Sequence, residues 1–101
     1  MSKDDIKKQL LQSLEKDPLK ERIKRASLFG SYLHGEASDK SDVDVLIEFK
    51  PSAKVGYFEL ADIQENLERS VGRRVDLLTP RAISKYFRDR VLAEAELIYE
   101  G

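Results

Sequence analysis

The opening segment carries apolar residues at helical spacing. Ile6, Leu10 and Leu14 recur every four residues, with charged side chains between them, so this segment is expected to form an amphipathic helix. The pair Asp17-Pro18 ends it, because the residue before a proline is driven out of the helical region and proline suits the first turn of a new helix. We therefore expect a second, short helical piece before the first strand.

A period of two marks the sequence "DVDVLIEF", residues 42–49, as a strand. Successive side chains of a strand point to opposite faces, so this strand has one apolar face and one mixed face. The apolar face holds Val43, Val45, Ile47 and Phe49, and the mixed face holds Asp42, Asp44, Leu46 and Glu48. An earlier strand is expected in "RASLFGS", beginning at Arg25 and ending at Gly30.

Residues 57–79 are expected to form a helix and a third strand. Six residues recur at helical spacing: Tyr57, Leu60, Ala61, Gln64, Leu67 and Val71. The helix is expected to end at Gly72, because glycine is well suited to follow the end of a helix. The sequence "RRVDLLT" then returns to a strand. One face of that strand holds Val75 and Leu77, and the other holds Arg74, Asp76 and Leu78.

The C-terminal part is expected to form one helix and a last strand. Thr79-Pro80 is a strong helix start, since threonine caps a helix and proline fills its first position. The helix is then expected to run on Ile83, Phe87, Val91 and Ala95, and the sequence "ELIYE" is expected to close the chain as a short extended piece.

These elements favour an α/β (α+β) fold in which helices back a small mixed sheet. The chain of 101 residues suits one domain, residues 1–101, and leaves no room for a second that would bind a separate substrate. If the chain is an enzyme, another molecule has to present the acceptor of the reaction.

Composition narrows the classes of partner. The 18 Lys and Arg residues offset 19 Asp and Glu residues, so no overall field draws the chain to nucleic acid or to an anionic membrane, and direct nucleic-acid binding is not expected. The chain has no cysteine, hence no disulfide and no thiolate metal site. No apolar run reaches membrane-spanning length, and the N-terminus is too acidic for a signal peptide, so we expect a cytoplasmic location.

Two carboxylates stand at the head of the second strand. Asp42 and Asp44 share a face and lie roughly 7 Å apart along the backbone, so they can converge on common ions. Oxygen ligands suit Mg²⁺, and a pair of such ions stabilises attacking and leaving oxygens in phosphoryl-group transfer. Asp76 supplies a third acid if its strand is adjacent. Three carboxylates around one point repel one another unless cations are bound, so the sequence predicts a metal site.

The pair Gly30-Ser31 ends the strand before these acids. Glycine permits a sharp turn and close approach of a phosphate to backbone amides. If a helix begins at Ser31, its free N–H groups and its dipole form an anion site, with the serine hydroxyl as one more donor. The turn is thus expected to hold a triphosphate near the metal-binding acids.

Structural interpretations of the same residues stay open. Asp42 could cap a turn, Asp44 could lie on an exposed edge, and Asp76 could pair with a neighbouring arginine. An EF-hand is excluded because apolar residues stand where its loop needs oxygens, and the P-loop motif does not occur. A nucleophilic Ser31 would need a base, and the only histidine, His34, has no evident orienting acid.

Gly30-Ser31, ten intervening residues and Asp42-Val43-Asp44 match the GS-x10-DxD signature of the DNA polymerase β-like nucleotidyltransferases. From "LFGSYLHGE" through "VDLLTPRAI" to "RDRVLAEAELIYE", the chain resembles their minimal, single-domain branch, the MNT antitoxins encoded beside HEPN-domain toxins. One departure is visible: many relatives carry an Arg-rich turn after Gly-Ser, whereas this chain has Tyr32-Leu33-His34.

The resemblance implies a polymerase β-like fold, Mg²⁺-dependent use of ATP, and transfer of AMP to a hydroxyl. It assigns Asp42, Asp44 and Asp76 to two Mg²⁺ ions, with Asp76 also as base toward the attacking hydroxyl. It assigns Gly30 and Ser31 to the β and γ phosphates. The implied acceptor is a tyrosine of the partner, a HEPN-domain toxin with RNase activity that the modification silences. A hetero-oligomer with that toxin is therefore expected.

Two other functions stay open. The chain could act as a non-catalytic antitoxin that neutralises its partner by binding alone, although such a module has no reason to keep three clustered acids. It could also transfer nucleotides to a small molecule such as an aminoglycoside. Relatives with that activity resemble this chain only in the motif and carry an extra domain for the acceptor.

Overall fold

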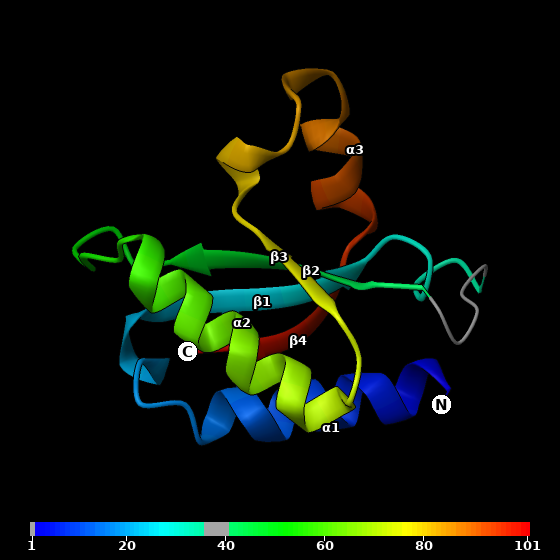
Figure 1. Ribbon diagram of the computed structural model, residues 1–101. Helices are drawn as coiled ribbons and strands as arrows, with labels where there is room; N and C mark the ends of the chain where they lie inside the picture. The colour runs from blue at the N-terminus through cyan, green and yellow to red at the C-terminus, as the bar shows by residue number, and fades with distance from the viewer. Residues whose placement is uncertain (1, 36–40) are drawn as a thin grey trace.

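The computed structural model describes residues 2–35 and 41–101, which form a four-stranded sheet with helices on both sides (Figure 1). This confirms the expected fold of a small mixed sheet backed by helices. The helices are α1 (Lys3–Glu15), α2 (Tyr57–Val71) and α3 (Lys85–Glu94), with short 3₁₀ helices η1 (Lys20–Arg22) and η2 (Pro80–Ala82). The strands are β1 (Ile23–Phe29), β2 (Val43–Phe49), β3 (Val75–Leu78) and β4 (Glu96–Glu100).

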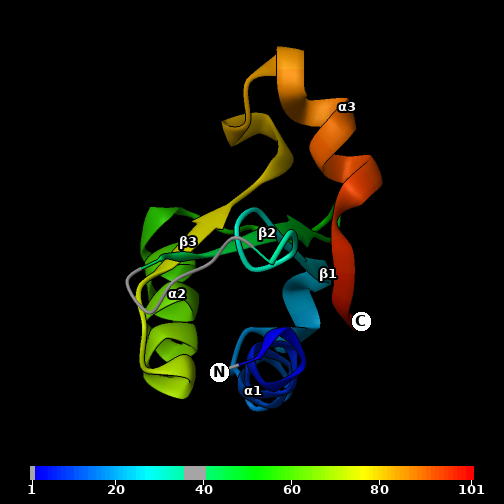
Figure 2. The ribbon, with the colours of Figure 1, turned by 90° about the vertical axis from the view of Figure 1, so that its right-hand side faces the viewer.

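The sheet has the strand order β3-β2-β1-β4. β1 runs antiparallel to β2 and to β4, whereas β2 and β3 are parallel. Parallel neighbours need a long crossover connection, and α2 supplies it between β2 and β3. α1 and α2 cover one face of the sheet, and α3 stands on the opposite side (Figures 1 and 2).

α1 begins with a capping box. The Ser2 hydroxyl accepts the Asp5 N–H, and the Asp5 carboxylate accepts the Ser2 N–H, each at 3.2 Å. The residues that α1 buries are Ile6, Leu10 and Leu14, as predicted from their spacing. This stripe lies against the sheet and fixes α1 across it.

α2 confirms the helix predicted from the spacing of residues 57–71. The residues that it buries are Ile63, Leu67 and Val71, of which Ile63 lies outside the predicted spacing. Tyr57, at the start of the helix, is 80% exposed. Gly72 follows the helix at φ 67°, as expected of a helix-ending glycine.

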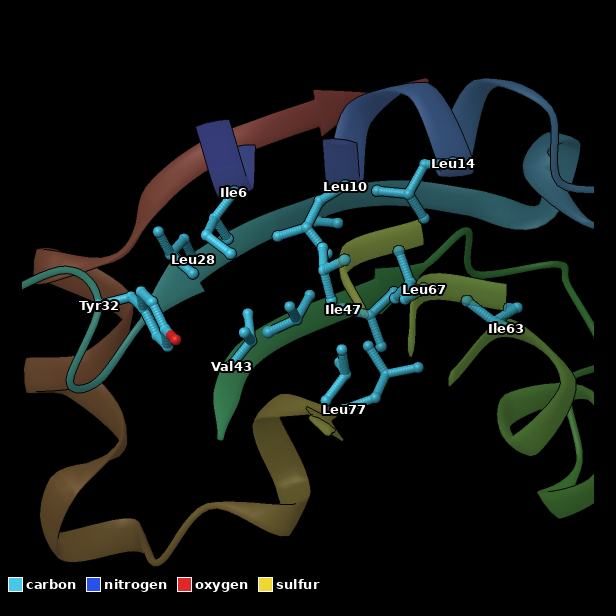
Figure 3. Packing of buried hydrophobic residues seen from close by; sticks show 14 of the residues in the cluster. Ile6, Leu10, Leu14, Leu28, Tyr32, Val43, Ile47, Ile63, Leu67 and Leu77 are labelled. Atoms are coloured by element: carbon cyan, nitrogen blue, oxygen red, sulfur yellow. The ribbon is translucent and has the colours of Figure 1, made fainter. Parts of the chain in front are cut away.

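The core lies between the two helices and the apolar face of the sheet (Figure 3). β2 contributes Val43, Val45 and Ile47, all fully buried, and Phe49 packs partly buried beside them. This confirms the alternation predicted for β2. Tyr32, from the turn after β1, joins the cluster with 6% of its surface exposed. The mixed face of β2, with its acids, consequently faces away from the core.

The break after α1 is built around Asp17, which is 4% exposed. Its carboxylate accepts the Leu19 N–H at 2.8 Å and the Asn66 side-chain N–H at 3.2 Å, so both of its oxygens are partnered. η1 is the expected second helical piece. β1 starts at Ile23, two residues earlier than predicted, and ends at Phe29, one residue earlier than predicted.

The C-terminal helix differs from the prediction. Pro80 begins only η2, and α3 starts separately with Ser84 as its cap, whose hydroxyl accepts the Tyr86 N–H at 3.4 Å. Ile83 between them has extended dihedral angles and is buried, which interrupts the expected single helix. Phe87 is 59% exposed, and α3 buries none of its residues. β4 confirms the expected final extended piece.

Among the helices described, none combines the length and hydrophobicity needed to cross a membrane.

Candidate active site

Asp44 and Asp76 are neighbours across two parallel strands. They are Cα partners in the pairing of β2 with β3, so their side chains stand on the same face of the sheet. That face is the one opposite α1 and α2. Asp42 directly precedes β2 and shares the side of Asp44 by alternation. The structure therefore brings the three predicted acids to one end of one sheet face.

Gly30 lies against the Asp44 carboxylate. Phe29, the last residue of β1, pairs with Asp44, which brings the following glycine to the same place. A Cβ atom added to Gly30 would collide with the side chain of Asp44, and the glycine has φ 77°, a conformation that other residues rarely adopt. Both the space and the backbone thus require glycine at this position.

The segment after Gly30 is a turn, the loop alternative of the sequence analysis. In residues 31–35 the N–H groups of Leu33 and His34 donate to the Gly30 carbonyl at 3.1 and 3.2 Å. The condition for an anion site at a helix start is therefore not met at Ser31. The backbone N–H of Ser31 donates to the Asp44 carboxylate. Gly30 and Ser31 thus fix the position of an acid before any phosphate is bound.

The surroundings of Asp44 raise the pKa of its carboxyl. The largest cause is desolvation by burial, followed by the negative charges of Asp76 and Asp42, and the hydrogen bond from Ser31 opposes these effects. The charged form of Asp44 is thus disfavoured until a cation compensates for it. This is the electrostatic property expected of carboxylates that hold a metal ion.

The donor set suits Mg²⁺. Three carboxylates supply the hard oxygen ligands that this ion takes, and neighbouring strands lie about 4.8 Å apart, so Asp44 and Asp76 can reach one ion. Within residues 2–35 and 41–101, no three Asp, Glu or His side chains are already grouped so that they could hold a metal ion. Like charges on unneutralised carboxylates oppose such a grouping.

Two contacts of the turn were not predicted from the sequence. The Arg73 guanidinium lies 5.8 Å from the centre of the Tyr32 ring, which ties the turn to the residues before β3. His34 Nε2 lies 3.3 Å from Glu94 Oε2 at the end of α3. The sequence favoured hydrogen bonding of His34 within its own loop, and no local pattern announces a contact with Glu94. Together these contacts hold the turn from both sides.

Gly30→Ala should destabilise the fold more than Gly35→Ala. Both glycines have positive φ, 77° and 71°, so each substitution costs about 1–2 kcal/mol of backbone strain. A Cβ on Gly35 meets no described atom within 4 Å, whereas one on Gly30 collides with Asp44, adding about 1–3 kcal/mol. Urea unfolding of both variants measures the difference. Equal losses would show that Gly30 and Asp44 are not in contact.

In metal-free buffer, the free energy of unfolding of Asp44→Asn should increase relative to that of the natural chain as the pH rises. A carboxyl whose pKa is raised on folding binds extra protons in the folded state, so its stabilising contribution is present at low pH and is lost as pH rises through the raised pKa. The asparagine side chain does not ionise, so the variant does not lose stability in this way. Urea unfolding with EDTA between about pH 3 and pH 8 tests it. A pH-independent difference would contradict the pKa direction.

Comparisons with known proteins agree with this geometry. The family described as "Nucleotidyltransferase domain" matches residues 7–98. A Methanocaldococcus jannaschii sequence provisionally named a protein adenylyltransferase is 37% identical over 95 residues, covering 94% of this chain and 96% of its own length.

Solved structures give the same result. One provisionally described as a minimal nucleotidyltransferase superposes with a TM-score of 0.76 at 28% identity, covering 94% of each chain. A Shewanella oneidensis complex of a tri-AMPylated HEPN toxin with an MNT antitoxin gives a TM-score of 0.67 at 16% identity, covering 98% of this chain and 73% of the other, which shows a shared fold. The chain therefore belongs to the nucleotidyltransferase domain family, as a minimal nucleotidyltransferase of the group that includes the protein adenylyltransferases.

Proposed function

We propose that this chain is a Mg²⁺-dependent protein adenylyltransferase that transfers AMP from ATP to a tyrosine hydroxyl of a HEPN-domain toxin and so acts as its antitoxin. The observation that carries the proposal is the pairing of Asp44 with Asp76 on the face of the sheet opposite α1 and α2, directly beside the Gly30-Ser31 turn. Acids from two strands and a turn from a third segment converge there, as transfer between a nucleotide and a hydroxyl requires.

Asp42, Asp44 and Asp76 would hold two Mg²⁺ ions. When bound, the ions neutralise phosphate charge and stabilise the attacking and leaving oxygens. Asp44 is suited to the central position because it is the most enclosed of the three and has a fixed orientation, with the Ser31 N–H on one of its oxygens. Asp42 and Asp76 are exposed, which leaves their oxygens accessible to the substrates.

Asp76 would accept the proton of the attacking hydroxyl. The hydroxyl oxygen then forms a bond to the α-phosphorus of ATP, the bond from that phosphorus to the bridging oxygen breaks, and pyrophosphate leaves. Gly30 and Ser31 would position the β and γ phosphates through the turn that follows β1. Most of the rate enhancement comes from positioning and from compensation of charge, since the chemistry itself needs no covalent intermediate.

A protein acceptor is supported by two observations. The described residues form one sheet with its helices, and Asp42 and Asp76 are exposed on the face of that sheet opposite α1 and α2. The Shewanella oneidensis complex contains a HEPN toxin that carries AMP, beside an MNT antitoxin of the same fold. Because the reaction consumes ATP with Mg²⁺, we place it in the cytoplasm.

Asp44→Asn should abolish AMP transfer to the HEPN-domain toxin that the proposal names as acceptor. Loss of a metal ligand removes several kcal/mol of charge stabilisation, so we expect a decrease of at least about a hundredfold. Mass spectrometry after incubation with ATP and Mg²⁺ measures the added AMP. Asp62→Asn, an exposed acid on α2, is the matched control and should keep full transfer.

The same variant separates enzymatic from purely steric action in cells. If Asp44→Asn binds the partner but no longer suppresses its toxicity, suppression depends on AMP transfer. Continued suppression by a folded, binding-competent variant would show that the chain neutralises its partner by binding alone. An unmodified partner with the natural chain would overturn the proposed reaction.

A further inference from the structure

A groove of about 460 Å³ runs between the sheet and the end of α3, on the same side of the sheet as the acids. Its apolar lining comes from three elements: Leu46 on β2, Leu92 on α3 and Leu97 on β4, with Ala95 between the last two. Leu92 and Leu97 are 41% and 50% exposed, so much of their apolar surface faces solvent. Figure 2 shows α3 standing above the sheet and descending into β4 at this place.

The groove is continuous with the active site. Leu46 follows Asp44 by two residues on the same strand face, which is a separation of roughly 7 Å. Ser27 of β1 pairs with Leu46 on one side and with Leu97 on the other, so the floor crosses three adjacent strands. A molecule seated in the groove would therefore have one part within reach of the acids.

α3 gains little from the rest of the chain. It has ten residues and buries none of them, and isolated helices of this length are marginal in water. Its closest tertiary association is with η2. Part of its apolar surface, at Leu92, instead lines the groove. A ligand that packs on Leu92 would add the burial that α3 lacks.

The lining also carries a net negative charge. Arg25 and Glu48 face each other, with Nε and Oε2 3.3 Å apart, and largely compensate one another. Glu100, the Cα partner of Arg25 on β4, adds a second carboxylate to the lining. A cationic side chain on the ligand would complete the charges at this end, opposite the end where the acids lie.

The size and chemistry of the groove favour a polypeptide. A cavity of this volume accommodates more than one side chain, and its lining combines the exposed leucines Leu92 and Leu97 with the charged side chains of Arg25, Glu48 and Glu100. Apolar anchors at the centre with polar groups at the rim are the usual arrangement of a protein interface.

We propose that this groove seats the acceptor protein: a segment with apolar side chains packs on the exposed surfaces of Leu92 and Leu97, above Leu46 on the floor, and a basic residue lies at Glu100. The acceptor hydroxyl, further along the same protein, then reaches Asp44 and Asp76. This inference rests on the proposed function, because it names where the protein acceptor of that reaction binds.

Binding of the proposed HEPN-domain acceptor to the full chain, measured by calorimetry, tests the groove. Leu97→Asp and Leu92→Asp each place a charge among the apolar contacts from a different element, and each should weaken binding at least about tenfold. Phe58→Asp is the matched control: Phe58 is 80% exposed on α2, outside the groove, and its substitution should leave binding unchanged. Thermal unfolding of every variant verifies that it is folded.

Failure of the groove as a docking site can be distinguished from failure of the proposed AMP transfer. If both leucine variants are folded and bind the partner as tightly as the natural chain, the groove is not the docking site, whatever the transfer assay gives. If Phe58→Asp weakens binding as much as they do, the groove has no special role either. If the leucine variants lose binding while the natural chain adds no AMP to the partner, the groove stands as a docking site and the proposed reaction fails.

Discussion

The site depends on the placement of the Asp44 carboxylate. β2 carries this acid on its mixed face, the pairing with β1 puts Gly30 against it, and the pairing with β3 puts Asp76 beside it. Each contact comes from a different strand, so the position of the acid is a property of the whole sheet. The raised pKa of Asp44 shows the electrostatic cost of this placement, which a divalent cation would offset.

One face of the sheet forms the core, and the other face carries the candidate functional residues. α1 and α2 press the apolar face into a continuous core that holds β1, β2 and β3 in register. The opposite face carries the acids at one end and, at the other, a groove beneath α3 that leucines and charged side chains line. In the function proposed above, the acids would hold metal and nucleotide, and the groove would be covered by the acceptor protein.

Most of this arrangement could be predicted from the sequence. The alternation through Val43, Val45 and Ile47 is unambiguous, and it assigns Asp44 to the opposite face. The turn after Gly30 could not be predicted, because the Ser31 N–H goes to an acid that is distant in sequence. The break at Ile83 and the exposure of Phe87 also depend on tertiary structure: helical spacing shows which residues could be buried, and only the fold shows whether a core lies beneath them.

A crystal structure with Mn²⁺ in place of Mg²⁺ and a non-hydrolysable ATP analogue tests the central claim most directly, since the anomalous signal of manganese locates the ions. The account predicts manganese between the carboxylates of Asp42, Asp44 and Asp76, with the nucleotide phosphates against the Gly30-Ser31 turn. Manganese bound elsewhere, or Asp76 turned away from an ion held by the other two, would contradict it.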